Sequence, residues 1–149
     1  MKLSNGALHN SVRLSDFVGI PFISGGRDFN GCDCWGLVML YYKHMLKQNL
    51  PDYRVSADDF PKISETMHTE TETPNSVWDI YYGSDPKPDR IALMRLGYSD
   101  DINHAGVILP DGRMLHCYES TGSCIVDPKS PKWANLIRMY IRPLGAIKL

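Results

Sequence analysis

Gly31-Cys32-Asp33-Cys34-Trp35-Gly36-Leu37-Val38 is the stretch that decides the fold, because in it a glycine-containing loop turns into a helix at a cysteine. Asp33 is one of the residue types favoured at a helix N-cap, so it predicts a helix that begins at Cys34. We expect this helix to run to about Gln48, ahead of Pro51. Apolar residues recur along it at the spacing of one inward-facing stripe, at Leu37, Val38, Leu40, Tyr41 and Met45.

Cys34 has two interpretations at this position. A thiol on the first helical turn lies at the positive end of the helix dipole, so we expect its pKa to fall toward neutrality and thiolate to accumulate. The same helix end supplies backbone N–H groups for an oxyanion. Alternatively, Cys34 is the first member of the apolar stripe, because free cysteines are among the most buried residues. Partners elsewhere in the sequence decide between these interpretations.

Residues 103–118 read as a β-hairpin that carries two histidines and turns at Pro110-Asp111-Gly112. A two-residue turn at Asp111-Gly112 would place His104 and His116 on opposite faces of the sheet. A three-residue loop, with Pro110 and Asp111 in a type I turn and Gly112 in the left-handed region, places His116 diagonally beside His104 on one face. Proline at the first position and glycine at the last favour the second register. We therefore expect a histidine pair within hydrogen-bonding reach.

The order Cys34, His104, His116 resembles that of the NlpC-type cell-wall cysteine peptidases, a compact papain-like family. The resemblance is carried by Asp33-Cys34-Trp35-Gly36-Leu37-Val38 and His104-Ala105-Gly106-Val107, and it extends to residues 19–28 and 88–93. Tryptophan after the cysteine, with Gly-Arg-Asp ahead of it, looks most like the copies found among tail proteins of tailed phages and prophages.

The resemblance implies a cysteine endopeptidase that cuts peptidoglycan stem peptides, usually after D-γ-glutamate. His104 would take the proton of Cys34 in a thiolate–imidazolium pair, and His116 would orient His104. The candidate substrate-binding residues are Trp35, Arg27 and Asp33. Two other classes stay open: a structural tail-tip subunit with vestigial activity, and an acyltransferase or amidase that uses the same cysteine and histidine.

The chain departs from the family pattern at two places. Phe22 stands where the family commonly has a tyrosine, so a hydroxyl that would approach the thiol is absent. The usual glycine before the acidic residue of the preceding strand is replaced around Pro88-Asp89-Arg90. The first change bears on rate or substrate positioning, and the second on a turn.

Length and composition favour a single domain over residues 1–149, with 43% hydrophobic and 22% charged residues to close one core. A net charge of −1 gives no electrostatic reason to expect nucleic acid or an anionic membrane as a partner. Residues 1–10 lack the apolar run of a signal peptide, and no apolar stretch approaches a membrane span. We expect synthesis in the host cytoplasm and then a place in the virion tail tip beside other tail-tip proteins.

The cysteines raise the question of a metal. The spacings of Cys32, Cys34, Cys117 and Cys124 do not match those of structural zinc sites, so a metal is the minority interpretation. A disulfide is not expected in a reducing compartment. Cys32, Cys117 and Cys124 are then small core or surface residues. We expect no cofactor.

Helices come before strands along the chain, which predicts an α+β fold with helices packed on a central antiparallel sheet. We expect a short amphipathic segment at 15–18 and a second helix at 56–67, capped by Ser56 or Asp58, followed by a polar loop at 68–74. Residues 77–82 fit either a helix or a strand. Strands are expected at 91–95, 105–109, 114–119, 124–126 and 136–142.

Overall fold

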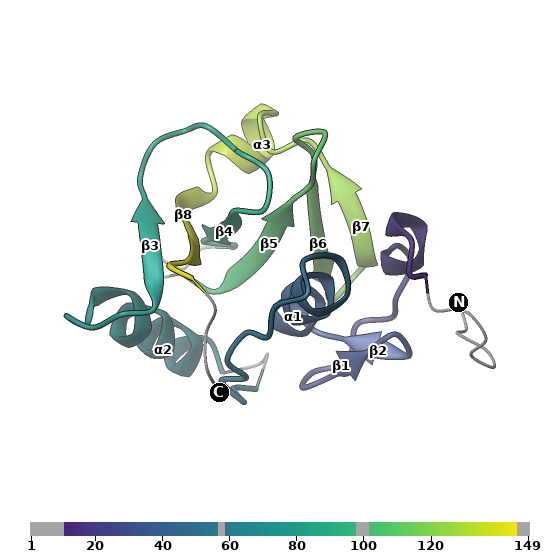
Figure 1. The fold of residues 1–149 in the computed structure, drawn as a ribbon, viewed down its shortest axis with the longest axis horizontal. Helices are drawn as coiled ribbons and strands as arrows, with labels where there is room; N and C mark the ends of the chain where they lie inside the picture. Colours follow the sequence, from purple (N-terminus) through teal and green to yellow (C-terminus); the bar gives the residue numbers. More distant parts are fainter. Residues whose placement is uncertain (1–10, 57–58, 98–101, 146–149) are drawn as a thin grey trace.

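The computed structural model describes residues 11–56, 59–97 and 102–145 of the 149. Residues 1–10, where the sequence predicts no signal peptide, and Asp58, one of the two expected caps, lie outside the described part. The fold is built on a six-stranded antiparallel sheet (Figure 1) in the order β3-β8-β4-β5-β6-β7. Its strands are β3 (Trp78–Tyr81), β4 (Ile91–Met94), β5 (His104–Ile108), β6 (Met114–Tyr118), β7 (Gly122–Val126) and β8 (Ile137–Pro143).

Helix α1 (Cys34–Met45) lies on one face of the sheet and contacts β5 and β6 (Figure 1). Helix α2 (Phe60–Glu72) packs beside β3, and a 3-10 helix (Leu14–Phe17) precedes the sheet. A short hairpin, β1 (Arg27–Asp28) and β2 (Gly31–Cys32), leads directly into α1. The expected arrangement of helices on an antiparallel sheet is confirmed.

Apolar side chains cover both faces of the central strands. All residues of β4 and of β5 are buried. The face under α1 holds the larger core, which includes Phe17, Leu37, Leu93, Val107 and Leu115. The opposite face holds a smaller cluster, closed by the short helix α3 (Pro131–Ala134) and formed by Ala92, Met94, Ile108, Met114 and Tyr140. The hairpin β5–β6 is therefore held rigidly from both sides.

The register of this hairpin is the one that the three-residue loop predicts. Gly106 pairs with His116, and Ile108 pairs with Met114. Gly112 has a φ of 91°, in the left-handed region, and its N–H donates to the carbonyl of Leu109 at 2.9 Å. His104 and His116 consequently lie on the same face.

Four sequence predictions about the helical part need correction. Helix α1 ends at Met45 rather than near Gln48, and Met45 is exposed instead of lying in the inward stripe. Helix α2 is capped by Asp59, whose carboxylate accepts from the Lys62 N–H, and not by Ser56 or Asp58. It also continues to Glu72, so most of the polar segment expected as a loop is helical. The ambiguous segment 77–82 contains a strand, β3.

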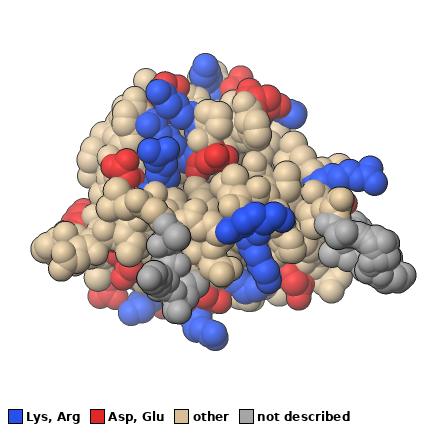
Figure 2. Space-filling model, viewed as in Figure 1, with Lys and Arg blue, Asp and Glu red and all other residues tan. Residues whose placement is uncertain are grey.

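The two signs of charge are mixed on the surface. Figure 2 shows Lys and Arg side chains lying among Asp and Glu side chains over one face. None of the described helices is both long and apolar enough to cross a membrane.

Candidate active site

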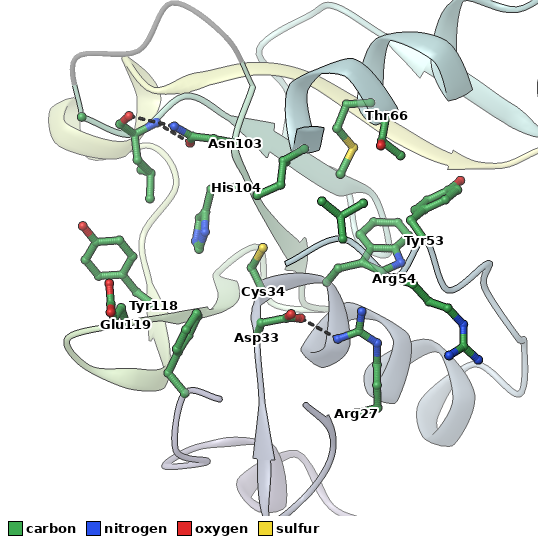
Figure 3. A pocket seen from close by; sticks show the side chains of 17 residues that line it. Arg27, Asp33, Cys34, Tyr53, Arg54, Thr66, Asn103, His104, Tyr118 and Glu119 are labelled. Atoms are coloured by element: carbon green, nitrogen blue, oxygen red, sulfur yellow. Dashed lines mark hydrogen bonds and ion pairs between the residues drawn. The ribbon is translucent and has the colours of Figure 1, made fainter. Parts of the chain in front are cut away.

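Cys34 is the first residue of α1, as predicted. The Asp33 carboxylate caps the helix by accepting the Gly36 N–H at 2.9 Å. Gly36 is required here because an added Cβ would lie 2.1 Å from the carbonyl oxygen of Gly26. The loop before the helix is thus packed directly against its first turn, which fixes where the thiol points. Figure 3 shows the Cys34 sulfur and the His104 ring at the same pocket.

The expected histidine pair is present. His104 Nε2 and His116 Nδ1 lie 2.9 Å apart, and the two rings are almost perpendicular, at 87°. Because the Nε2 atom of His104 is hydrogen-bonded to His116, only the Nδ1 atom of His104 remains available to the Cys34 thiol. Both imidazoles are buried, and the His116 ring packs on Trp133 with centroids 4.7 Å apart. The structure therefore brings Cys34, His104 and His116 together in that order.

Arg27 and Asp33 form an ion pair beneath the thiol. Arg27 Nη1 lies 2.8 Å from Asp33 Oδ1, and Arg27 Nη2 lies 3.1 Å from Asp52. The other Asp33 oxygen accepts the Gly25 N–H at 2.8 Å. Asp28, the next residue along the chain, accepts the N–H of Asn30 at 2.9 Å. Both groups line the cleft, yet their polar atoms are already engaged with each other and with the loop.

Protonation at rest differs from the sequence prediction. Desolvation, with the charge of Asp33, raises the pKa of the Cys34 thiol to about 12, although the N–H groups of Ala105 and Trp35 act in the opposite direction. Desolvation, with the neighbouring His116, lowers the pKa of His104 to about 3. The expected thiolate–imidazolium pair is therefore wrong for the resting state, because loss of hydration outweighs the helix terminus. Both pKa directions favour a thiol beside a neutral imidazole at neutral pH.

A cleft of about 200 Å³ opens beside Cys34 and His104 (Figure 3). Trp35 forms part of its wall, as the sequence suggested, and is held by its indole N–H donating to the Pro51 carbonyl at 2.8 Å. Phe22 also lines it. Sequence reasoning missed the remaining walls, which come from the loop after α1, from α2 and from the end of β6, and include Tyr53, Val55, Ile63, Met67 and Tyr118. The apolar spacing of α2 signals a buried face but not that this face borders the cysteine.

The other cysteines are free thiols. Cys32 and Cys117 are buried and Cys124 is partly exposed, so all three fit the roles expected from the sequence. Within the described residues, no group of three or more His, Cys, Asp or Glu side chains is arranged to hold a metal ion.

Comparisons with known proteins identify the family to which this fold belongs. The model of the NlpC/P60 family matches residues 19–142. Tail tip assembly protein K of Escherichia phage N15 is 32% identical over 104 residues, which are 64% of this chain and 37% of that protein. The chain thus matches little more than a third of that relative's length.

Two solved structures share the fold. The NlpC/p60 domain of the peptidoglycan hydrolase SagA aligns with a TM-score of 0.55 at 16% identity, covering 86% of this chain and 91% of that one. A lipoprotein-like NLP/P60 family protein from Staphylococcus aureus aligns with a TM-score of 0.54 at 17% identity, covering 87% of this chain and 38% of that one. By the extent of the family match, from Gly19 through the cysteine and both histidines to Arg142, this chain belongs to the NlpC/P60 family.

Proposed function

We propose that this protein is a cysteine peptidase that hydrolyses peptidoglycan stem peptides, after D-γ-glutamate, and that it works at the tail tip of a phage or prophage. One observation carries the proposal: the thiol of Cys34 shares an open cleft with a histidine, His104, one of whose ring nitrogens is held by a second histidine. A nucleophile, a base and an orienting group in that order are the parts that acyl transfer needs.

The reaction starts from the neutral pair. The Cys34 S–H proton passes to His104 Nδ1 as the sulfur attacks the amide carbonyl carbon, so charge develops only along the reaction path. His104 then gives that proton to the leaving amine as the C–N bond breaks, which leaves a thioester on Cys34. Water, deprotonated by His104, hydrolyses the thioester and restores the thiol.

The first residues of α1 are the best-placed hydrogen-bond donors for the oxyanion that forms during the reaction. The backbone N–H groups of the first helical residues have no acceptor inside the helix, so that of Cys34 is available to the developing charge. The Asp33 carboxylate does not serve this purpose, because it accepts from Gly25 and Gly36 and pairs with Arg27. We assign Arg27 and Asp33 to the support of the cleft floor and Trp35 to its wall.

The tail-tip assignment draws on the relative from phage N15, which is named as a tail tip assembly protein. On this proposal the partners are peptidoglycan and neighbouring tail proteins. Local opening of the wall at the tip would then accompany delivery of the phage genome.

Digestion of purified peptidoglycan, with mass spectrometry of the released fragments, tests the proposal. Wild type should release fragments with new amino termini at one stem-peptide position, and both Cys34→Ala and His104→Ala should abolish their release. His68→Asn, which removes an exposed histidine of α2, is the matched control and should retain activity. Cleavage at an amide outside the stem peptide would support the amidase alternative. No release by folded wild type would instead favour a structural tail subunit.

A further inference from the structure

The outer nitrogen of His116 meets a second cysteine. Cys124, on β7, pairs with His116 across the sheet, and its Sγ atom lies 3.5 Å from His116 Nε2. Thr121 Oγ1 lies 3.8 Å from the same sulfur. The Thr121 hydroxyl in turn donates to the carbonyl oxygen of Gly122 at 2.9 Å. A continuous chain of contacts therefore leads from the base, His104, through His116 to a backbone carbonyl.

The carbonyl of Gly122 fixes the direction of donation along this series of hydrogen bonds, because a carbonyl accepts hydrogen bonds and cannot donate them. The hydroxyl hydrogen of Thr121 is committed to Gly122, so its oxygen is an acceptor for the Cys124 S–H. The Cys124 sulfur is then left to accept from His116 Nε2–H. With its hydrogen on Nε2, His116 presents a bare Nδ1 to His104.

The same direction of donation decides which ring nitrogen of the base, His104, carries the hydrogen. His104 must donate its Nε2–H to the bare Nδ1 of His116, so its own Nδ1 carries a lone pair toward Cys34. In the opposite direction His104 would present an Nδ1–H to the thiol and could not take its proton. Which nitrogen of a histidine is protonated is set by the hydrogen bond that the other nitrogen makes.

We propose that Cys124, directed by Thr121, is a positioning residue that holds the two histidines in the one tautomeric arrangement in which His104 accepts the Cys34 proton. The proposal rests on the hydrolase function proposed above. Cys124 is not among the residues that line the cleft, so it acts through His116 and not on the substrate. Because His116 is only 2% exposed and packs on Trp133, a loss of this acceptor is poorly compensated by water.

Matched substitutions separate hydrogen bonding from packing. Cys124→Ser keeps an acceptor and a donor, whereas Cys124→Val fills similar space with neither. We expect Cys124→Val to lower kcat on a stem peptide about tenfold, the equivalent of one lost buried hydrogen bond, with KM changed less than about twofold. Cys124→Ser should recover most of kcat. Thr121→Val, compared with Thr121→Ser, should repeat the pattern with a smaller effect.

Nitrogen NMR of the histidine rings at neutral pH gives a readout that needs no turnover. In wild type, His104 and His116 should both carry hydrogen on Nε2, and Cys124→Val should move part of that population to Nδ1. An unchanged kcat in Cys124→Val, equal losses in the serine and valine variants, or unchanged tautomers would each overturn the proposal. If the wild-type protein cuts no stem peptide, the proposed hydrolase function is refuted. The NMR measurement of the histidine tautomers then tests the role of Cys124 separately.

Discussion

Mild acid should destabilise this protein through its two buried histidines. The folded-state pKa is about 3 for His104 and about 4 for His116, against a reference of 6.5. Because both folded values lie below the reference, the unfolded chain binds protons first as the pH falls. The stabilisation from keeping the imidazoles neutral is therefore complete above pH 6.5 and is lost below it.

The size of the effect follows from the pH interval. At pH 5 each histidine is about 1.5 pH units below the reference pKa and still neutral in the folded protein, which corresponds to about 2 kcal/mol per histidine. Lowering the pH from 7 to 5 should therefore remove about 4 kcal/mol of unfolding free energy through the pair. Such a loss is a large part of the stability of a domain of this size.

Urea unfolding at pH 7 and pH 5 measures this loss. The double variant His104→Asn/His116→Asn cannot titrate at these positions, so its free energy of unfolding should depend much less on pH, whatever its absolute stability. His68→Asn controls for the loss of an exposed imidazole. Equal losses between pH 7 and pH 5 in wild type and in the double variant would refute the reasoning.

Three further predictions concern the first turn of α1. Because the pKa of Cys34 is raised to about 12, iodoacetamide should alkylate it slowly at pH 7 and faster at pH 9.5, as mass spectrometry of the labelled peptide will show. Gly36→Ala should cost about 1–3 kcal/mol, since its Cβ would lie 2.1 Å from a backbone carbonyl oxygen, and urea unfolding measures it. Arg27→Met should cost about 2 kcal/mol of unfolding free energy, because it leaves the buried Asp33 carboxylate without its cation.

Each of these has a control in the same chain. Alkylation of Cys34 at pH 7 as fast as that of an unfolded thiol would contradict the assigned protonation. Gly145→Ala, where an added Cβ meets nothing within 4 Å, should leave stability unchanged. Arg113→Met breaks an ion pair with Asp111 whose side chains are about half exposed, so it should cost little. If Arg27→Met and Arg113→Met cost the same, the Asp33 carboxylate does not depend on Arg27.

Local chemistry accounts for the parts of the site that could be predicted from the sequence. The hairpin register depends on three consecutive residues, Pro110-Asp111-Gly112, and the cap of α1 depends on Asp33 and its neighbours. Both are decided by short-range conformational preferences, which is why the histidine pair and the position of Cys34 could be predicted without a structure.

Features that depend on distant packing could not be predicted in this way. Arg27 pairs with Asp52 as well as with Asp33. Asp52 comes close to Arg27 only because the loop after α1 folds back. The raised pKa of Cys34 comes from loss of hydration against the sheet, which a helix-terminus argument does not include. Helix α2 continues through a polar segment in which Thr71 is buried and its hydroxyl donates to the Met67 carbonyl at 2.7 Å, while His68 contacts Glu72 at 2.9 Å.

The strand order has a consequence for how the protein acquires its structure during synthesis. β8, the last strand of the described residues, is not an edge strand but lies between β3 and β4. β3 therefore has no strand to pair with until Ile137–Pro143 has left the ribosome. Pairings between residues so far apart in sequence are slow to form, because the chain must close long loops before it gains the contacts. Completion of the sheet thus waits for β8, and a nascent chain lacking β8 holds its nucleophile and its base without the complete fold that aligns them.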